Sequence, residues 1–191
     1  MNHGIPPTYF KQVSRNITDE DISLIVSRIQ QRQLKKGEAI LKEGEVCHCI
    51  YLVSKGYLRN YTNKEGVTIN LNFTFEGNYT TNLKSIYSQQ PSEFTIEAGE
   101  CTVVWIFDFS ERFQLDDMIV LFIRRVIAFM LIAAEEQSNF YKIYTPTERY
   151  HYIEKNNPQL LQRISLSQLA SYLGVTRETL SRIRAKKSTS K

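Results

Sequence analysis

The chain has 191 residues and an ordinary globular composition, 42% hydrophobic and 23% charged, so it can bury one large core or two small ones. Its formal charge of +4 is unevenly placed: residues 145–191 contain nine Lys or Arg and three acids, a net of +6, while residues 1–144 carry −2. A basic segment on a slightly acidic body is typical of a module that binds a polyanion, although a solvated basic tail would have the same charge.

The cysteines and the apolar runs exclude several classes of protein. Cys47, Cys49 and Cys101 fit neither a disulfide framework nor a zinc site, and the N-terminus lacks the apolar run of a secretion signal. Both features indicate a reducing cytoplasm. The most apolar stretch, residues 118–134, contains two consecutive arginines near its centre. Arginines are costly inside a membrane, so we predict a helix in water and no membrane partner.

The first half of the chain predicts a short helix followed by short strands. Residues 18–21 (Thr-Asp-Glu-Asp) precede apolar residues at helical spacing and predict a capped helix. Val67, Ile69, Leu71 and Phe73 alternate with polar residues, as in a half-buried strand. Strands are predicted at residues 50–53, 57–61, 67–73, 93–97 and 102–107. Short strands separated by glycine turns indicate a sandwich or barrel.

A long helix is predicted at residues 116–144. Seven of its residues follow the 3-4 spacing of a coiled-coil seam: Ile119, Phe122, Val126, Phe129, Ala133, Glu136 and Phe140. Further apolar residues widen this surface, so the helix needs cover from the barrel on one side and from a twin helix on the other. We therefore predict dimerisation; a helix buried wholly within its own subunit is the alternative.

The last quarter of the chain predicts a series of short helices. Pro146 suits the first turn of a helix and marks the domain boundary that we expect. Residues 164–185 then predict two helices joined at Gly174, which can take the positive φ that ends the first one. Thr176 is a natural N-cap for the second. The inward residues are Leu166, Leu169, Ala170 and Leu173 in the first helix, and Leu180 and Ile183 in the second.

The outward residues of the second helix suit DNA. They are Arg177, Glu178, Ser181, Arg182 and Arg184. A helix laid N-terminus first into the major groove presents such side chains to base edges, where arginine can bond guanine O6 and N7 and glutamate can accept from cytosine N4. A helical hairpin with solvated charges fits the apolar spacing equally well. It does not explain why two arginines are placed where they could contact bases, within a segment of net charge +6.

Several of these segments resemble the Crp/Fnr family of transcription regulators. Residues 36–38 (Lys-Gly-Glu), 43–45 (Glu-Gly-Glu) and the turn at 51–56 are similar to the opening of that family's β-roll. The most specific part is residues 176–183, Thr-Arg-Glu-Thr-Leu-Ser-Arg-Ile, which are similar to the recognition helix of the catabolite activator branch.

The resemblance implies an α+β fold in three parts. These are a β-roll of the cyclic-nucleotide-binding jelly-roll type at residues 1–115, a dimerisation helix at 116–144, and a winged-type helix-turn-helix DNA-binding domain at 145–191. It implies that Arg177 and Arg182 read guanines, that Glu178 reads a cytosine and that Thr176, Thr179 and Ser181 contact phosphate, with Arg184 completing the DNA-binding set. The implied partners are double-stranded DNA with a pseudo-palindromic, G·C-containing operator, a second copy in a homodimer, and RNA polymerase.

Two family features are missing. Aligned without gaps, the Gly-Glu places of the family's phosphate cassette hold Thr81 and Asn82, and its Arg-Ser places hold Ser92 and Glu93. The arginine's charge-assisted contact to phosphate is absent, so we expect no cyclic nucleotide bound in the usual way and no cofactor. The pocket is then empty or takes an uncharged or apolar ligand. Residues 184–191 are too few for the family's two-stranded wing, so we expect a truncated wing.

Two other functions compete with this interpretation. A ligand-sensing module that acts on a protein partner without DNA would keep the phosphate cassette. A cupin-like metalloenzyme would need several histidines and a carboxylate in the barrel, where only His48 occurs, so we expect no enzyme. Cys47 and Cys49 are predicted to pack as small residues facing one side of a strand, in preference to a redox switch. No cysteine precedes them to form the iron–sulfur cluster of the family's redox branch.

Overall fold

The structure is a computed structural model that describes residues 18, 29–108 and 117–188. The helix predicted to begin at Thr18 lies outside the described residues. The strands are β1 (Ile29–Leu34), β2 (Ala39–Leu41), β3 (Cys49–Lys55), β4 (Tyr57–Lys64), β5 (Val67–Phe75), β6 (Tyr79–Thr80), β7 (Thr95–Ala98) and β8 (Thr102–Asp108). The helices are α3 (Leu83–Ser88), α4 (Asp117–Ile143), α5 (Pro146–Asn156), α6 (Pro158–Arg163), α7 (Leu166–Leu173) and α8 (Arg177–Ser188).

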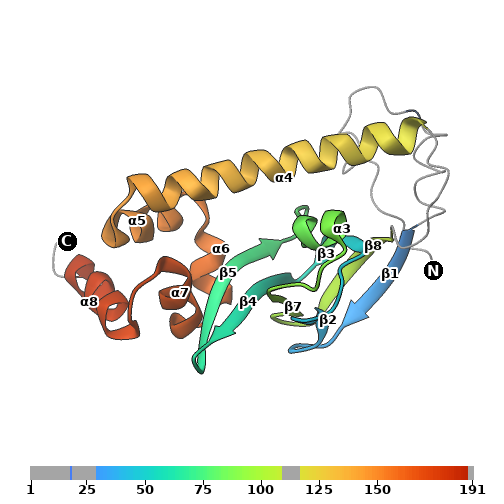
Figure 1. Ribbon diagram of the computed structural model, residues 1–191. Helices are drawn as coiled ribbons and strands as arrows, with labels where there is room; N and C mark the ends of the chain where they lie inside the picture. The colour runs from blue at the N-terminus through green and yellow to red at the C-terminus, as the bar shows by residue number, and fades with distance from the viewer. Residues whose placement is uncertain (1–17, 19–28, 109–116, 189–191) are drawn as a thin grey trace.

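The strands form a β-roll of two four-stranded antiparallel sheets, with strand orders β1-β8-β3-β6 and β2-β7-β4-β5 (Figure 1). Side chains from both sheets share one buried core, made of Leu34, Leu41, Cys47, Tyr51, Val53, Leu58, Ile96, Ala98 and Val104. The predicted β-roll and its five predicted strands are thereby confirmed. Strands β1, β2 and β6 and helix α3 were not predicted, because they are short or, as in β1, mostly polar and exposed.

The predicted alternation of β5 is only partly right. Phe73 is buried as expected, but Leu71 is exposed and its polar neighbour Asn70 is buried. The pairing of β4 with β5 explains the difference: Asn60 pairs with Asn72 and the next residue of β4 pairs with Asn70, so Leu71 is a bulge. A bulge of one residue exchanges the two faces of a strand beyond it.

Helix α4 crosses the whole molecule above the sheets and connects the β-roll with the C-terminal helices (Figure 1). The seam predicted along it is partly wrong as a dimer contact, because Val126 and Phe140 are buried against the helix's own subunit. Its exposed large apolar residues include Leu121, Phe129, Leu131, Ile132 and Ile143. No helix among the described residues is long and apolar enough to cross a membrane.

Helices α5 to α8 pack into a second core that also includes residues of the β-roll. Helix α5 begins as predicted at Pro146, and the preceding residue Thr145 forms a reciprocal capping box with Glu148. Helix α6 was not predicted. This core joins β4 and β5 to α4 and the C-terminal helices. Its buried members are Tyr57, Phe73, Phe75, Phe140, Tyr150, Ile153, Leu160, Ile164, Leu169, Ala170, Leu173 and Leu180.

Candidate nucleic-acid interface

Helices α7 and α8 are joined by a tight turn at Gly174. Gly174 adopts φ = +72°, and its N–H bonds to the last carbonyls of α7, which ends that helix as the sequence predicts. Val175 donates to the carbonyl of Ala170 at 3.0 Å, which closes the turn. Leu173 and Leu180 have no exposed surface, so the inner faces of both helices are fully packed.

The outer face of α8 carries the residues predicted to contact DNA. Six of them are exposed and Thr179 is half-buried; the exposed ones are Thr176, Arg177, Glu178, Ser181, Arg182 and Arg184. Thr176 precedes the helix and accepts a hydrogen bond from the N–H of Thr179 at 3.2 Å, so it serves as the predicted N-cap. The chain thus brings together all seven residues, with Thr176 as the N-cap and the other six at the beginning of α8.

Glu178 lies between two arginines of this face. Hydrogen bonds from its own backbone N–H and from Thr176 hold the pKa of its carboxyl below the usual range, and the charges of Arg177 and Arg182 act in the same direction. The carboxylate is therefore ionised and can accept a hydrogen bond from a donor such as the cytosine amino group.

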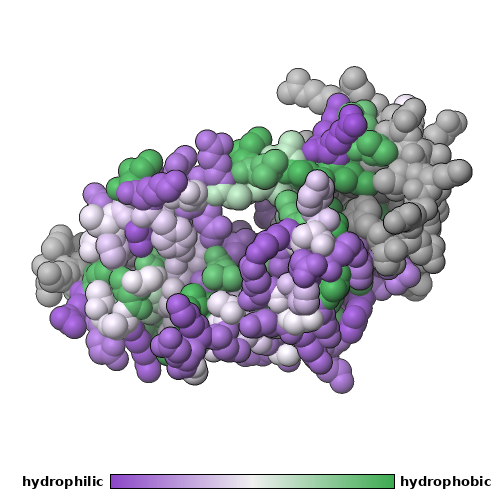
Figure 2. All heavy atoms as spheres, in the orientation of Figure 1, coloured by the Kyte–Doolittle hydropathy of each residue, from purple (hydrophilic) through white to green (hydrophobic). Residues whose placement is uncertain are grey.

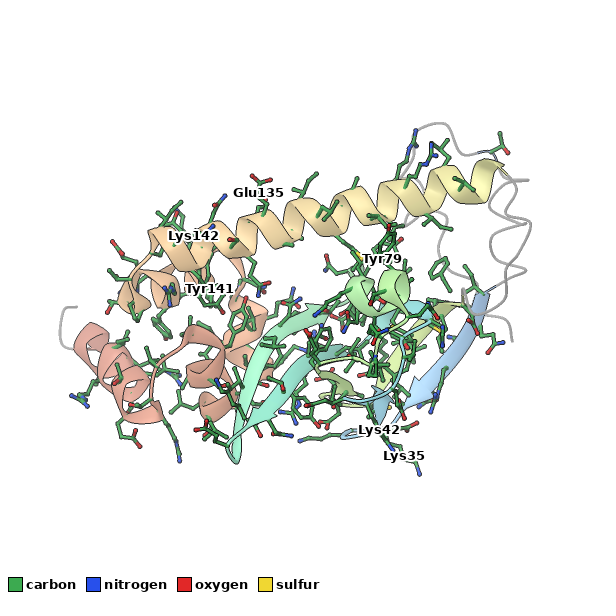
Figure 3. All side chains as sticks on the ribbon, viewed as in Figure 1. Lys35, Lys42, Tyr79, Glu135, Tyr141 and Lys142 are labelled. Carbon is green, nitrogen blue, oxygen red and sulfur yellow. The ribbon has the colours of Figure 1, made fainter. Side chains whose placement is uncertain are left out.

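The α7–α8 pair is held against α4 and α5 by one arginine that the sequence did not single out. Arg149 donates from Nη1 to the carbonyl of Leu173 at 3.1 Å and from Nη2 to the carbonyl of Tyr141 at 2.6 Å. Its guanidinium also lies 4.9 Å from the centre of the Tyr141 ring. The Tyr141 hydroxyl, which points from α4 toward α7, bonds to the carbonyl of Tyr172 (Figure 3). Arg149 therefore fixes the end of α7 that leads into α8.

Two polar contacts join the C-terminal helices to the β-roll. Ser171 of α7 accepts from the N–H of Asn70 at 2.9 Å and donates to the carbonyl of Thr68 at 3.1 Å, so α7 lies along the edge strand β5.

The second contact is an ion pair at the end of α6. Arg163 binds both carboxylate oxygens of Glu76, at 2.8 and 2.9 Å, and one oxygen of Glu100 at 2.6 Å. Its guanidinium also lies over the rings of Tyr57 and Phe75. Sequence reasoning missed both contacts, since the paired residues are 63 to 103 positions apart.

The four residues at the places of the phosphate cassette all have hydrogen-bond or ion-pair partners within the β-roll. Asn82 caps α3 by accepting from the N–H of Ser85 and donates to the Ser92 hydroxyl at 2.9 Å. The Thr81 hydroxyl donates to the carbonyl of Cys49 at 2.6 Å. Glu93 forms an exposed ion pair with Lys84. The place where the family has an arginine is thus occupied by a neutral, hydrogen-bonded serine.

The two neighbouring cysteines are packed into the β-roll. Cys47 is fully buried and its thiol bonds to the carbonyl of Cys49 at 3.4 Å. Burial raises the pKa of the Cys49 thiol to about 12, and the nearby Asp108 carboxylate adds to this effect. Since the thiolate is the reactive form of cysteine, this environment favours packing over redox chemistry.

Comparisons with known proteins agree with this architecture. Residues 31–115 match the family model described as cyclic nucleotide-binding domain. No curated protein matches the chain.

Solved structures of bacterial regulators resemble almost the whole chain. FixK2 from Bradyrhizobium japonicum is 22% identical with a TM-score of 0.68, and the match covers 84% of this chain and 85% of that one. A Crp/Fnr-family transcriptional regulator from Thermus thermophilus is 15% identical with a TM-score of 0.67 over 84% and 86% of the two chains. The catabolite activator protein of the same organism is 20% identical with a TM-score of 0.57 over 93% and 86%. Residues 31–115 therefore resemble a cyclic nucleotide-binding domain, and the chain has the fold seen in these Crp/Fnr-type regulators.

Proposed function

We propose that this protein is a transcription regulator that binds duplex DNA sequence-specifically through α8. The observation that carries the proposal is the outer face of α8, where Arg177, Glu178 and Arg182 are exposed while Leu180 on the inner face is fully buried. The major groove of DNA accepts a helix whose base-contacting side chains lie near its N-terminus. Arg177 and Arg182 then read guanines, Glu178 reads a cytosine, and Thr176, Thr179, Ser181 and Arg184 support them.

The proposed active form is a homodimer on a pseudo-palindromic operator. The apolar residues of α4 that its own subunit leaves exposed, such as Phe129, Leu131 and Ile132, are suited to a second copy of the same helix. Two recognition helices related by a twofold axis fit half-sites one DNA turn, about 34 Å, apart. Transcription would be changed through RNA polymerase in the cytoplasm, with no enzymatic step. The effector is not a cyclic nucleotide held by the family's phosphate cassette, since Ser92 stands where the arginine would be.

The test is selection of genomic fragments by the purified protein at physiological salt, without added ligand, followed by sequencing of the retained DNA. We expect a twofold motif with G·C steps. Variants Arg177→Ala and Lys35→Ala each remove one positive charge; Lys35 is exposed on the β-roll, far from α8 (Figure 3). Loss of the motif with Arg177→Ala but not with Lys35→Ala supports the proposal. Retention that is equal for all sequences, and equal in all three proteins, contradicts it.

A further inference from the structure

One face of the sheet β2-β7-β4-β5 carries aromatic side chains that belong to the core of the C-terminal helices. Tyr57, Phe73 and Phe75 are 3%, 8% and 4% exposed and cluster with buried residues of α6 and α7. Tyr57 pairs with Phe75 across β4 and β5, and their rings are 5.4 Å apart. Phe73 packs edge-on against the Tyr172 ring of α7 at 5.6 Å. In the space-filling view, the C-terminal helices and the β-roll are in continuous contact below α4 (Figure 2).

Polar contacts hold the C-terminal helices to this sheet at two points along β5. Just beyond the last residue of the strand, Glu76 receives two hydrogen bonds from Arg163, at 2.8 and 2.9 Å. In the first half of the strand, the N–H of Asn70 donates to the Ser171 hydroxyl at 2.9 Å. The chain from α6 to the end of α7 therefore follows β5 in the opposite direction. The turn at Gly174 and the beginning of α8 come directly after the last of these contacts.

The reading face of α8 is accessible in this arrangement. Arg177, Glu178 and Arg182 are exposed, so the described part of the β-roll does not cover them. Separation of α7 from the sheet would expose three aromatic side chains, each of which buries about 150–250 Å². The docked arrangement is therefore the stable one, and it leaves the reading residues free to meet DNA.

We propose that the aromatic face of β4 and β5, with Arg163 and Ser171 at its two ends, positions α7 and thereby α8 for reading the operator. These are positioning residues, which act through α7 and do not touch DNA. The β-roll and the C-terminal helices then form one cooperative folding unit with a fixed orientation of α8. The inference rests on the proposed function for its effect on DNA binding, whereas the cooperative unfolding that it requires is measured without DNA.

The first test follows urea unfolding of the full chain with two signals. Trp105 is the single tryptophan and lies in β8, so its fluorescence reports on the β-roll, while far-ultraviolet circular dichroism reports on the helices. We expect both signals to give the same midpoint. Ile164→Val removes one methylene group from the core that the sheet and the C-terminal helices share, so it should lower both midpoints equally. Separate transitions, or a shift of the helical signal alone, would overturn the inference.

The second test uses two carboxylates with matched contacts. Glu76 accepts hydrogen bonds from Arg163 of α6 and from one backbone N–H of the β-roll. Glu38 accepts hydrogen bonds from Arg32 and from one backbone N–H, all within the β-roll. Glu76→Ala and Glu38→Ala therefore remove the same charge and the same kinds of bond, but only Glu76→Ala loosens α6.

The quantity measured is the ratio of the affinities for the selected operator and for a scrambled duplex, by fluorescence anisotropy. We expect Glu76→Ala to lower this ratio about three- to tenfold, toward the lower end of the roughly 5- to 150-fold effect of one lost bidentate base contact. Ser171→Ala keeps the net charge and should also lower the ratio, and it decides the test alone if Glu76→Ala does not fold. Glu38→Ala should leave the ratio unchanged. Loss of an acid by itself favours every DNA sequence, so electrostatics alone would not lower the ratio.

Two results of the second test would overturn the inference. An unchanged ratio in both Glu76→Ala and Ser171→Ala would show that these contacts do not position α8. Tighter operator binding by Glu76→Ala than by Glu38→Ala would show that the contact restrains DNA binding. Failure of the wild type to select a motif would instead contradict the proposed function, and it would leave the unfolding result standing.

Discussion

The outer face of α8 has the opposite chemistry to a cavity of about 440 Å³ that lies between the β-roll and α4. The face of α8 is exposed and carries Arg177, Arg182 and Arg184, whereas the cavity walls contain neutral amides, hydroxyls and aromatic rings and, among the described residues, no cation. Both belong to a fold shared with solved regulators such as FixK2, and the β-roll matches the cyclic nucleotide-binding domain model. The comparison teaches that this chain carries cations suited to phosphate on the surface of α8 and lacks them in the walls of the cavity, so we expect phosphate contacts at α8 only.

The largest effect should come from the scaffold beneath the charged face. Leu180→Ala removes a side chain with no exposed surface, so we expect it to lower the free energy of unfolding by about 2–5 kcal/mol. The neighbouring substitution Ser181→Ala is exposed and should stay within about 0.5 kcal/mol. Urea unfolding followed by circular dichroism measures both. Equal effects of the two variants would show that α8 is not anchored through its inner face.

A second prediction concerns the charges themselves. Arg177→Ala and Arg182→Ala should each reduce operator affinity by about 1–3 kcal/mol, or about 5- to 150-fold, and relax the preference at one base pair. Neither should change the unfolding free energy noticeably, since both side chains are exposed. Fluorescence anisotropy with the selected operator and its single-base variants measures this. An arginine whose loss weakens all sequences equally is only a phosphate contact.

The third prediction concerns how the affinity for DNA depends on salt concentration. Binding of DNA to α8 should weaken steeply between low and physiological salt, because phosphate contacts release counterions. Arg184→Ala should reduce the slope of this salt dependence by about one, whereas Lys35→Ala, on the β-roll, should leave it unchanged. Titrations of the operator with each protein at four salt concentrations measure these slopes. Equal slopes for the two variants would show that Arg184 does not contact phosphate.

The charged face could be predicted from the sequence because it depends on local spacing. Leu180 and Ile183 recur at the helical repeat and face inward. The same repeat places Arg177, Glu178 and Arg182 on the outer face, and this assignment needs no contact with a distant part of the chain. The β-strands were predicted for the same reason, from alternation and glycine turns.

The cavity and the contacts between the two halves depend on distant pairing and could not be predicted. The bulge at Leu71 exists only once β4 and β5 are paired, and it reversed the faces that alternation assigned. Proline occurs both just after a helix and in the first turn of one, so Pro158 alone did not predict α6, which begins at this residue.

The smallest expected effect tests the ion pair that joins the two regions. Burial alone would raise the pKa of the Glu76 carboxyl, but hydrogen bonds from Arg163 and from backbone N–H groups, including that of Gly56, hold it below the ordinary value. A carboxyl with a lowered pKa stabilises the fold above its unfolded-state pKa, about 4.3, and loses this contribution as the pH falls through the lower folded-state pKa. Because these side chains are partly exposed, we expect Arg163→Gln to cost only about 1–2 kcal/mol of unfolding free energy at neutral pH.

That cost should be constant between about pH 6 and 8 and should shrink as the pH falls below about 4, where Glu76 becomes protonated in both proteins. Urea unfolding of the wild type and of Arg163→Gln at several pH values measures it. Arg32→Gln is the matched control, because Arg32 pairs with Glu38 within the β-roll and is more exposed. A difference between wild type and Arg163→Gln that persists unchanged in acid would mean that Arg163 acts by packing over Tyr57 and Phe75, and that the charge of Glu76 does not hold the C-terminal helices to the β-roll.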